Sequence, residues 1–230
     1  MNSPIIPVIT IDGPSGAGKG TIAQMLALDL GWNILDSGAL YRSLAYYFEK
    51  ESLNPEDIDD NLEKIKKDFI VHFDAGVPGE PVKIFFQNKD VTTQLRTEEV
   101  AKKTSILAAN PYVRAFIKPC QRDFMMLPGL IADGRDMGTV IFSDADLKIF
   151  LTASIEERAK RRQVQLKRQG SEVNMRVLLR ELEDRDNKDT EREHSPLKPA
   201  KDSIIIDTSN IDPIGVIKEI KSQPFDFFKR

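Results

Sequence analysis

The chain has 230 residues, with 33 Lys and Arg against 36 Asp and Glu, and its formal net charge of −3 does not indicate a polyanionic partner such as nucleic acid. Hydrophobic residues make up 40% and charged residues 30%, which is typical of a globular protein and excludes a disordered or collagen-like chain. A single cysteine, Cys120, indicates a reducing compartment, and neither an apolar run of ~20 residues nor a secretory signal is visible, so we expect a cytoplasmic protein with no membrane partner.

Short apolar segments alternate with helical patterns along most of the chain. The first segment ends at Asp12-Gly13 and is followed by a glycine-rich loop and by a helix that stops at Gly31. The dipeptide Asp212-Pro213 is a typical start of a last helix. Because strands that alternate with helices favour a parallel sheet covered on both faces, we expect an α/β fold. The five expected strands lie at about residues 8–11, 32–35, 130–132, 147–151 and 203–206.

An antiparallel insert interrupts this rhythm between the second and third core strands. Two strand-like segments flank a linker dense in Gly and Pro, which favours a hairpin, and a third short strand is expected at Val91-Thr92. Two helices follow, and Pro119 should kink the second of them. The hairpin strands cover about residues 69–73 and 82–86, and the helices about 97–109 and 111–126.

The glycine-rich loop lies between the first strand and the first helix, the context in which backbone N–H groups surround phosphates. Lys19 adds a mobile charge for the β- and γ-phosphates, and the helix start adds the positive end of its dipole. The strict pattern has Ser or Thr directly after the lysine, whereas here Gly20 intervenes and Thr21 follows. The loop predicts ATP or GTP binding by Gly13, Pro14, Ser15, Gly16, Ala17, Gly18, Lys19, Gly20 and Thr21.

Asp133 ends a buried apolar strand, where its carboxylate can reach a magnesium ion directly or through water. A strand-end aspartate can also be a simple turn residue, but the phosphate loop favours the metal. Asp12 holds the same position on the first strand and is a candidate helper. His72, His194 and Cys120 have no partner at the spacing of a metal site or a catalytic triad, so we expect structural roles for them.

Basic residues are concentrated between positions 158 and 180, with eight Lys and Arg and one acid, Glu172. Arg158, Arg161 and Arg162 share one helix face because they stand at i, i+3 and i+4. Such a segment is either a solvated amphipathic helix or the binding face for a phosphate-rich ligand.

A second helix follows this basic segment, and one of its ridges changes character. Leu178 and Leu182 belong to an apolar stripe, and Arg185, Asp189 and Arg192 continue that ridge at heptad spacing. The ridge either runs out into solvent or leaves the core and enters a polar cleft. Two arginines and an aspartate on one face suit an anionic ligand with hydroxyl groups, because Arg binds phosphate and Asp accepts from a sugar.

Five segments, GPSGAGKGT, LDSGALYR, IADGRDMGTVIF, ASIEERAKRR and RDNKDTER, occur in this order along the chain. Together they resemble the signature blocks of bacterial-type cytidylate kinase over about residues 8–210. The resemblance implies a P-loop NTPase core with a five-stranded parallel sheet flanked by helices, a small antiparallel β insert and a helical lid. It also implies transfer of the ATP γ-phosphoryl group to CMP or dCMP, with Mg²⁺, by a monomer.

The resemblance assigns regions and residues. The core would comprise residues 1–38, 127–153 and 190–230, the acceptor region 39–126 with its insert at about 69–93, and the arginine-rich lid 154–189. The catalytic set would be Lys19, Arg158, Arg161, Arg162 and Asp133, with Mg²⁺ held by Thr21 and Asp133, partly through water. The acceptor phosphate would be bound by Ser37, Arg42, Arg135 and Arg192, cytosine by Ser105, Arg114 and Asp136, and the sugar by Arg185 and Asp189.

Two features qualify this assignment. Lys188 stands where the family would have arginine, which keeps the charge but loses a bidentate fork. No obligatory general base is implied, although Asp36 or Asp133 could assist, because phosphoryl transfer needs mainly positioning and charge neutralisation.

Three other interpretations stay open at this level. Another P-loop kinase, acting on AMP, UMP or a non-nucleotide alcohol, would share the phosphate loop but leave DSGALYR and GRDMGTV unexplained. A nucleotide-dependent switch would need one nucleotide site, whereas the sequence has two basic sets. Nucleic-acid binding by the basic segment conflicts with the acidic net charge and with the few aromatic residues there.

Overall fold

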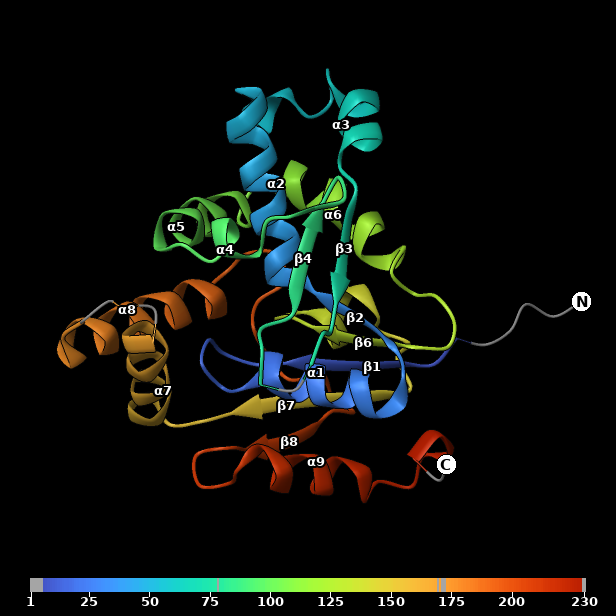
Figure 1. Ribbon diagram of the computed structural model, residues 1–230, viewed down its shortest axis with the longest axis vertical. Helices are drawn as coiled ribbons and strands as arrows, with labels where there is room; N and C mark the ends of the chain where they lie inside the picture. The colour runs from blue at the N-terminus through green and yellow to red at the C-terminus, as the bar shows by residue number, and fades with distance from the viewer. Residues whose placement is uncertain (1–5, 78, 169, 171–172, 229–230) are drawn as a thin grey trace, which may run out of the picture.

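The computed structural model describes residues 6–77, 79–168, 170 and 173–228, and the chain forms one parallel and one antiparallel sheet (Figure 1). The larger sheet has five parallel strands in the order β2-β6-β1-β7-β8. Their bounds are β1 Val8–Asp12, β2 Asn33–Asp36, β6 Leu130–Asp133, β7 Leu147–Thr152 and β8 Ile204–Asp207. The five-stranded parallel sheet expected from the sequence is confirmed.

The register of the central strands brings carboxylates to one edge of this sheet. Ile11 is paired with Asp133, and Asp133 is paired in turn with Asp36. Because the strands are parallel, the loops that follow them meet at this edge, where ligands bind in open α/β sheets. The glycine-rich loop begins there, directly after β1.

Helices cover both faces of the parallel sheet. One face packs against α1 and α9, and the other packs against α2 and α6. Gly31 ends α1 in the left-handed conformation, and Asp212 caps α9 by accepting from the Gly215 N–H at 2.7 Å. The bounds are α1 Lys19–Leu30, α2 Ser37–Glu51, α6 Pro111–Arg122 and α9 Pro213–Lys221.

The insert between β2 and β6 contains a three-stranded antiparallel sheet, β3-β4-β5. The third short strand expected around Val91-Thr92 is present, but it lies two residues earlier along the chain. Gln87 and Asn88 have positive φ angles and form a tight turn, so pairing resumes earlier, at Lys89. The bounds are β3 Val71–Asp74, β4 Lys83–Phe86 and β5 Lys89–Asp90, followed by the short helix α4 Thr92–Leu95.

The insert stands over the parallel sheet, and the turn between β3 and β4 reaches α1 (Figure 1). There the buried Gln24 donates from its side-chain amide to the carbonyls of Ala75 at 2.6 Å, Glu80 at 2.8 Å and Val77 at 3.3 Å. The remaining helices of this region are α3 Leu62–Asp68 and α5 Glu98–Leu107, with a 3₁₀ turn at Pro55–Asp57.

Two helices, α7 (Ile155–Arg168) and α8 (Met175–Thr190), pack against each other through a small apolar core of their own, which contains Ala159, Leu178 and Leu182. They project to one side of the parallel sheet (Figure 1). A π-helical turn at Met137–Ile141 and a 3₁₀ turn at Asp226–Phe228 complete the described elements. Among the described residues, no helix has the length and apolar content needed to cross a membrane.

Candidate active site

The glycine-rich loop curves around the start of α1. Gly13, Gly16 and Gly18 have φ angles of 144°, 80° and 92°, a region that residues with a Cβ rarely adopt. At Gly13 a Cβ would also lie 2.1 Å from the carbonyl oxygen of Leu151 on the neighbouring strand. The loop therefore requires glycine at these positions, whatever it binds.

Lys19 and Asp133 lie close together at the carboxyl end of the sheet. Lys19 Nζ donates to the Pro14 carbonyl at 3.0 Å and lies 4.0 Å from Asp133 Oδ1. Burial lowers the pKa of Lys19 and raises the pKa of Asp133, while their mutual attraction opposes both shifts. Both groups are thus shielded from bulk water. In such surroundings they interact with a phosphate or a cation more strongly than they would in water.

Gly20 occupies the position where the strict phosphate-loop pattern has a hydroxyl. Its α-carbon faces Asp133, since a Cβ on Gly20 would lie 3.5 Å from Asp133 Oδ2. Thr21, one residue further, is exposed. Of the two predicted metal ligands, Asp133 therefore lies beside the loop lysine, and Thr21 lies at the solvent-exposed start of α1.

Asp12, the candidate helper, is engaged with the backbone. Its carboxylate accepts from the N–H groups of Met137 at 2.9 Å and Gly138 at 2.8 Å. Burial raises the pKa of Asp12 to about 6, although these two hydrogen bonds lower it. Asp12 thus holds the π-helical turn in place after Asp136.

A cleft of about 600 Å³ opens beside the glycine-rich loop, residues 13–21, hereafter the P-loop. The cleft is bounded by residues of α2, α5 and α8. Every residue predicted for the acceptor nucleotide lines it, and so do Lys19, Asp133 and Arg162. The charged ridge of α8 enters this cleft rather than solvent. The predicted acceptor residues that line it are Ser37, Arg42, Ser105, Arg114, Arg135, Asp136, Arg185, Asp189 and Arg192.

Asp189 holds two arginines in fixed positions within the cleft. Its carboxylate accepts from Arg135 Nε at 2.9 Å and forms a short ion pair with Arg192. Burial alone would raise the pKa of Asp189, but Arg135 and Arg192 outweigh it and hold that pKa below its usual range. The two guanidinium groups are thereby preorganised for an anionic ligand.

A second ion pair, between Arg114 and Asp136, lies on the α6 side of the cleft. Arg114 also donates to the Ala108 carbonyl at 3.3 Å, and the Asp136 side chain is only 6% exposed. Nearby, Ser37 Oγ accepts from Gln121 Nε2 at 2.8 Å. Buried, mutually oriented polar groups of this kind can discriminate between bases through their hydrogen bonds.

Arg158 contacts the backbone of the P-loop. It is buried and donates to the carbonyls of Ser15 and Ala153, both at 3.1 Å, and its guanidinium pairs with Asp186 at 2.6 Å. The three arginines predicted to share a helix face do lie on one helix, α7, but Arg158 is directed to the backbone of the loop.

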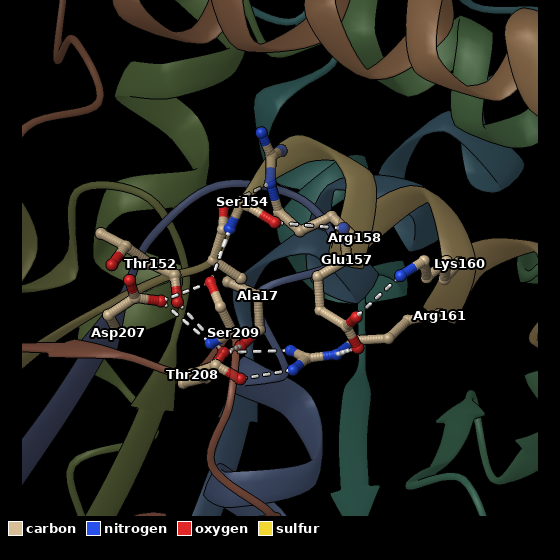
Figure 2. A network of polar contacts seen from close by, with 11 residues as sticks. Ala17, Thr152, Ser154, Glu157, Arg158, Lys160, Arg161, Asp207, Thr208 and Ser209 are labelled. Atoms are coloured by element: carbon tan, nitrogen blue, oxygen red, sulfur yellow. Dashed lines mark hydrogen bonds and ion pairs between the residues drawn. The ribbon is translucent and has the colours of Figure 1, made fainter.

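Arg161 and Arg162 have different partners again. Arg161 donates to the side chain and the carbonyl of Thr208, after β8, and pairs with Glu157 at 3.2 Å (Figure 2). Arg162 lines the cleft and donates to Gln165 at 2.9 Å. Arg162 thus extends into the cleft, whereas Arg158 contacts the P-loop backbone and Arg161 contacts Thr208 beside the P-loop.

Comparison with known proteins decides the family. The family profile described as cytidylate kinase matches residues 9–224 of this chain. The chain belongs to the cytidylate kinase family. Cytidylate kinase of Pseudomonas putida KT2440 is 48% identical over 223 residues, which are 97% of each chain. Those of Stutzerimonas stutzeri A1501 and Shewanella frigidimarina NCIMB 400 are 48% identical over 221 residues and 49% identical over 214 residues, covering 96% and 93% of each chain.

Two residues of this cytidylate kinase family member were not singled out from the sequence. Arg96 lines the cleft and donates to the Val82 carbonyl at 3.0 Å, while its buried Nε has no hydrogen-bond acceptor among the described residues. Thr208 connects Arg161 to the P-loop. Nothing in the sequence marks Arg96 apart from other cations of the insert, and Thr208 is one of several hydroxyl residues after β8.

Proposed function

We propose that this protein transfers the γ-phosphoryl group of ATP to CMP or dCMP, giving ADP and CDP or dCDP. The observation that carries the proposal is a single cleft that adjoins the phosphate loop and contains a second, separate set of arginines. Two anionic substrates in one cleft are what transfer between nucleotides requires. The curated relatives named cytidylate kinase, at 48–49% identity over nearly the whole chain, support cytidine monophosphates as acceptors.

In this proposal residues 13–21 bind the ATP phosphates, and Lys19 neutralises charge on the β- and γ-phosphates. Asp133 is suited to Mg²⁺, because an oxygen ligand at a strand end beside a phosphate loop is the donor that this ion uses. Within the described part of the chain, no three His, Cys, Asp or Glu residues are grouped to hold a metal, which agrees with an ion held mostly by phosphate and water. When bound, Mg²⁺ would reduce the negative charge of the phosphates.

The acceptor is recognised in three parts. Ser37, Arg42, Arg135 and Arg192 bind its phosphate, with Arg135 and Arg192 both held in position by Asp189. Arg185 and Asp189 contact the sugar. Ser105 and the Arg114–Asp136 pair read the cytosine edge, since a wrong base would leave these buried groups without partners.

Catalysis then consists of alignment and charge neutralisation. Lys19 and Arg162 stabilise negative charge on the transferred group, and closing of the lid, residues 154–189, over the core and the acceptor region 39–126 excludes water and prevents ATP hydrolysis. Arg158 and Arg161 contribute by holding the P-loop in shape, through Ser15 and Thr208 respectively. We further propose that the protein works as a cytoplasmic monomer.

The proposal is tested by ADP release from Mg-ATP with CMP, dCMP, UMP, AMP or no acceptor. Strong turnover with CMP and dCMP alone is expected. Asp136→Asn should reduce kcat/KM for CMP, whereas Asp144→Asn, which changes an exposed aspartate, is the matched control. Turnover with AMP or UMP instead would overturn the cytosine-reading role, and ADP release without any acceptor would favour a nucleotide-driven switch.

A further inference from the structure

Thr208 lies beside Ala17 of the P-loop, directly after β8 (Figure 2). Its side chain is buried, and Oγ1 donates to the Ala17 carbonyl at 3.0 Å. The Thr152 carbonyl also lies 3.0 Å from Oγ1, but it already accepts the Thr208 backbone N–H at 2.8 Å. The single hydroxyl hydrogen lies within reach of both carbonyls, and its donation to Ala17 is the contact that reaches the middle of the loop.

Arg161 donates a hydrogen bond to the oxygen of the same hydroxyl. Its Nη1 donates to Thr208 Oγ1 at 3.0 Å, and its Nη2 donates to the Thr208 carbonyl. Glu157, one turn earlier on α7, accepts from Arg161 Nε at 3.2 Å. A charged donor on the oxygen orients the hydroxyl hydrogen away from Arg161 and makes the hydroxyl a better donor to Ala17.

The Ala17–Gly18 peptide is a point where the loop can change shape. Gly16 and Gly18 have φ angles of 80° and 92°, whereas Ala17 between them keeps a negative φ, the alternation of hand that turns successive N–H groups towards an anion. Because a peptide is planar and trans, the Ala17 carbonyl and the Gly18 N–H point in opposite directions. A flip of this peptide, which glycine permits, would direct a carbonyl oxygen at the phosphates and remove one donor.

A second loop carbonyl is held in the same manner. The Ser15 carbonyl accepts from Arg158 Nη1 at 3.1 Å, and a Cβ on Gly16 would lie 3.0 Å from the Arg158 Cβ. Arg158 and Arg161 are one helical turn apart on α7, so the same helix face supports two outward-facing carbonyls of the loop, one directly and one through Thr208.

We propose that Thr208 is a positioning residue for the donor nucleotide: its hydroxyl, oriented by Arg161, fixes the Ala17 carbonyl outward and so keeps the Gly18 N–H directed at the phosphates. The proposal rests on the proposed role of residues 13–21 as the ATP site. It assigns Arg161 to the backbone of the loop through Thr208, in place of a direct contact with the transferred phosphate.

The test compares Thr208→Val, which keeps the shape and removes the hydroxyl, with Thr208→Ser, which keeps the hydroxyl. Ser209→Ala is the matched control, because Ser209 Oγ accepts from the Ser154 N–H at 2.9 Å and so joins the same loop to the start of α7 without touching the P-loop. Loss of one hydrogen bond of typical net strength should weaken ADP binding and raise the KM for ATP about 5- to 10-fold in Thr208→Val. KM for CMP should change less than about twofold, and Thr208→Ser and Ser209→Ala should match the wild type.

Several results would overturn this role. They are an unchanged ADP Kd and KM for ATP in Thr208→Val, an equal rise of KM for both substrates, no rescue by serine, or the same defect in Ser209→Ala. ADP binding is measured by calorimetry and needs no turnover, so wild-type protein that binds ADP but does not phosphorylate CMP would contradict the proposed function and leave the Thr208 comparison readable.

A double-mutant cycle tests the part played by Arg161. If Arg161 acts through Thr208, then Arg161→Gln combined with Thr208→Val should weaken ADP binding no more than the stronger single variant does. If the two substitutions instead raise the Kd for ADP by factors that multiply in the double variant, then Arg161 acts independently of Thr208 and its assignment to the loop is overturned.

Discussion

Gln24 connects the antiparallel insert to the P-loop helix through its side-chain amide. The amide nitrogen has two hydrogens, and three carbonyls of the β3–β4 turn lie within 2.6 to 3.3 Å of it. Gln24 is 5% exposed, so water does not readily replace the amide if it is removed. We therefore predict that Gln24→Met, which keeps the volume but has no donor, destabilises the protein.

The magnitude follows from these contacts. Two hydrogen bonds of about 1 kcal/mol each, plus a penalty for carbonyls left without a donor, give a loss of about 2–3 kcal/mol in the free energy of unfolding. For a chain of this size that loss corresponds to a decrease of roughly 5–10 °C in Tm. The amide protons of the turn, at residues 74–77, 79 and 80, should also exchange faster with deuterium, because the turn loses its attachment to α1.

Urea unfolding followed by circular dichroism measures the first effect, and hydrogen exchange with mass spectrometry measures the second. Gln94→Met is the matched control, since Gln94 is exposed, and it should change neither quantity. A loss below about 0.5 kcal/mol in Gln24→Met, with unchanged exchange in the turn, would refute the reasoning, because it would mean that water satisfies these carbonyls equally well.

Three further predictions concern single side chains. Lys19→Ala should lower kcat on the order of 100-fold or more, because a buried charge next to the transferred phosphate is lost, and steady-state kinetics near wild type would contradict this. Arg96 lines the cleft with a buried Nε that has no acceptor among the described residues, so we expect it to donate to the acceptor nucleotide. Arg96→Met should then raise KM for CMP about tenfold with KM for ATP unchanged, and a KM for CMP equal to that of the wild type would exclude the contact. Burial raises the pKa of Cys120 to about 11 from 9.0, so alkylation at pH 8 should be about 100-fold slower than in the urea-unfolded chain, and equal rates measured by mass spectrometry would contradict it.

The parallel sheet and the acceptor cleft were predictable because their signals are local or follow from strand polarity. Asp133 and Asp36 each end an apolar strand, and parallel strands bring such ends to one edge. Arg185 and Asp189 indicated a polar cleft, because they continue an apolar helix ridge with charged side chains. The third insert strand was misplaced because two left-handed residues at 87 and 88 shortened the turn, a conformation that Gln and Asn do not specify on their own.

The lid arginines show what spacing leaves undecided. Positions i, i+3 and i+4 fix a shared helix face but not the direction in which each long side chain extends. Arg158 reaches Ser15, 143 residues earlier, and Arg161 reaches Thr208, 47 residues later, whereas Arg162 enters the cleft. These partners become neighbours only when β1, β7 and β8 pair side by side.

By itself, the sequence indicated the phosphate loop, the order of strands and helices, the family, and a set of residues that the structure brings together in one cleft. The tertiary structure decided which arginines line the cleft, that Gly20 faces Asp133, and how Arg96 reaches the cleft and Thr208 the P-loop. The physical reason is that backbone conformation and hydrophobic periodicity depend on residues close in the chain. The partner of a buried charge or hydroxyl is instead set by whichever distant segment folding brings within hydrogen-bond distance.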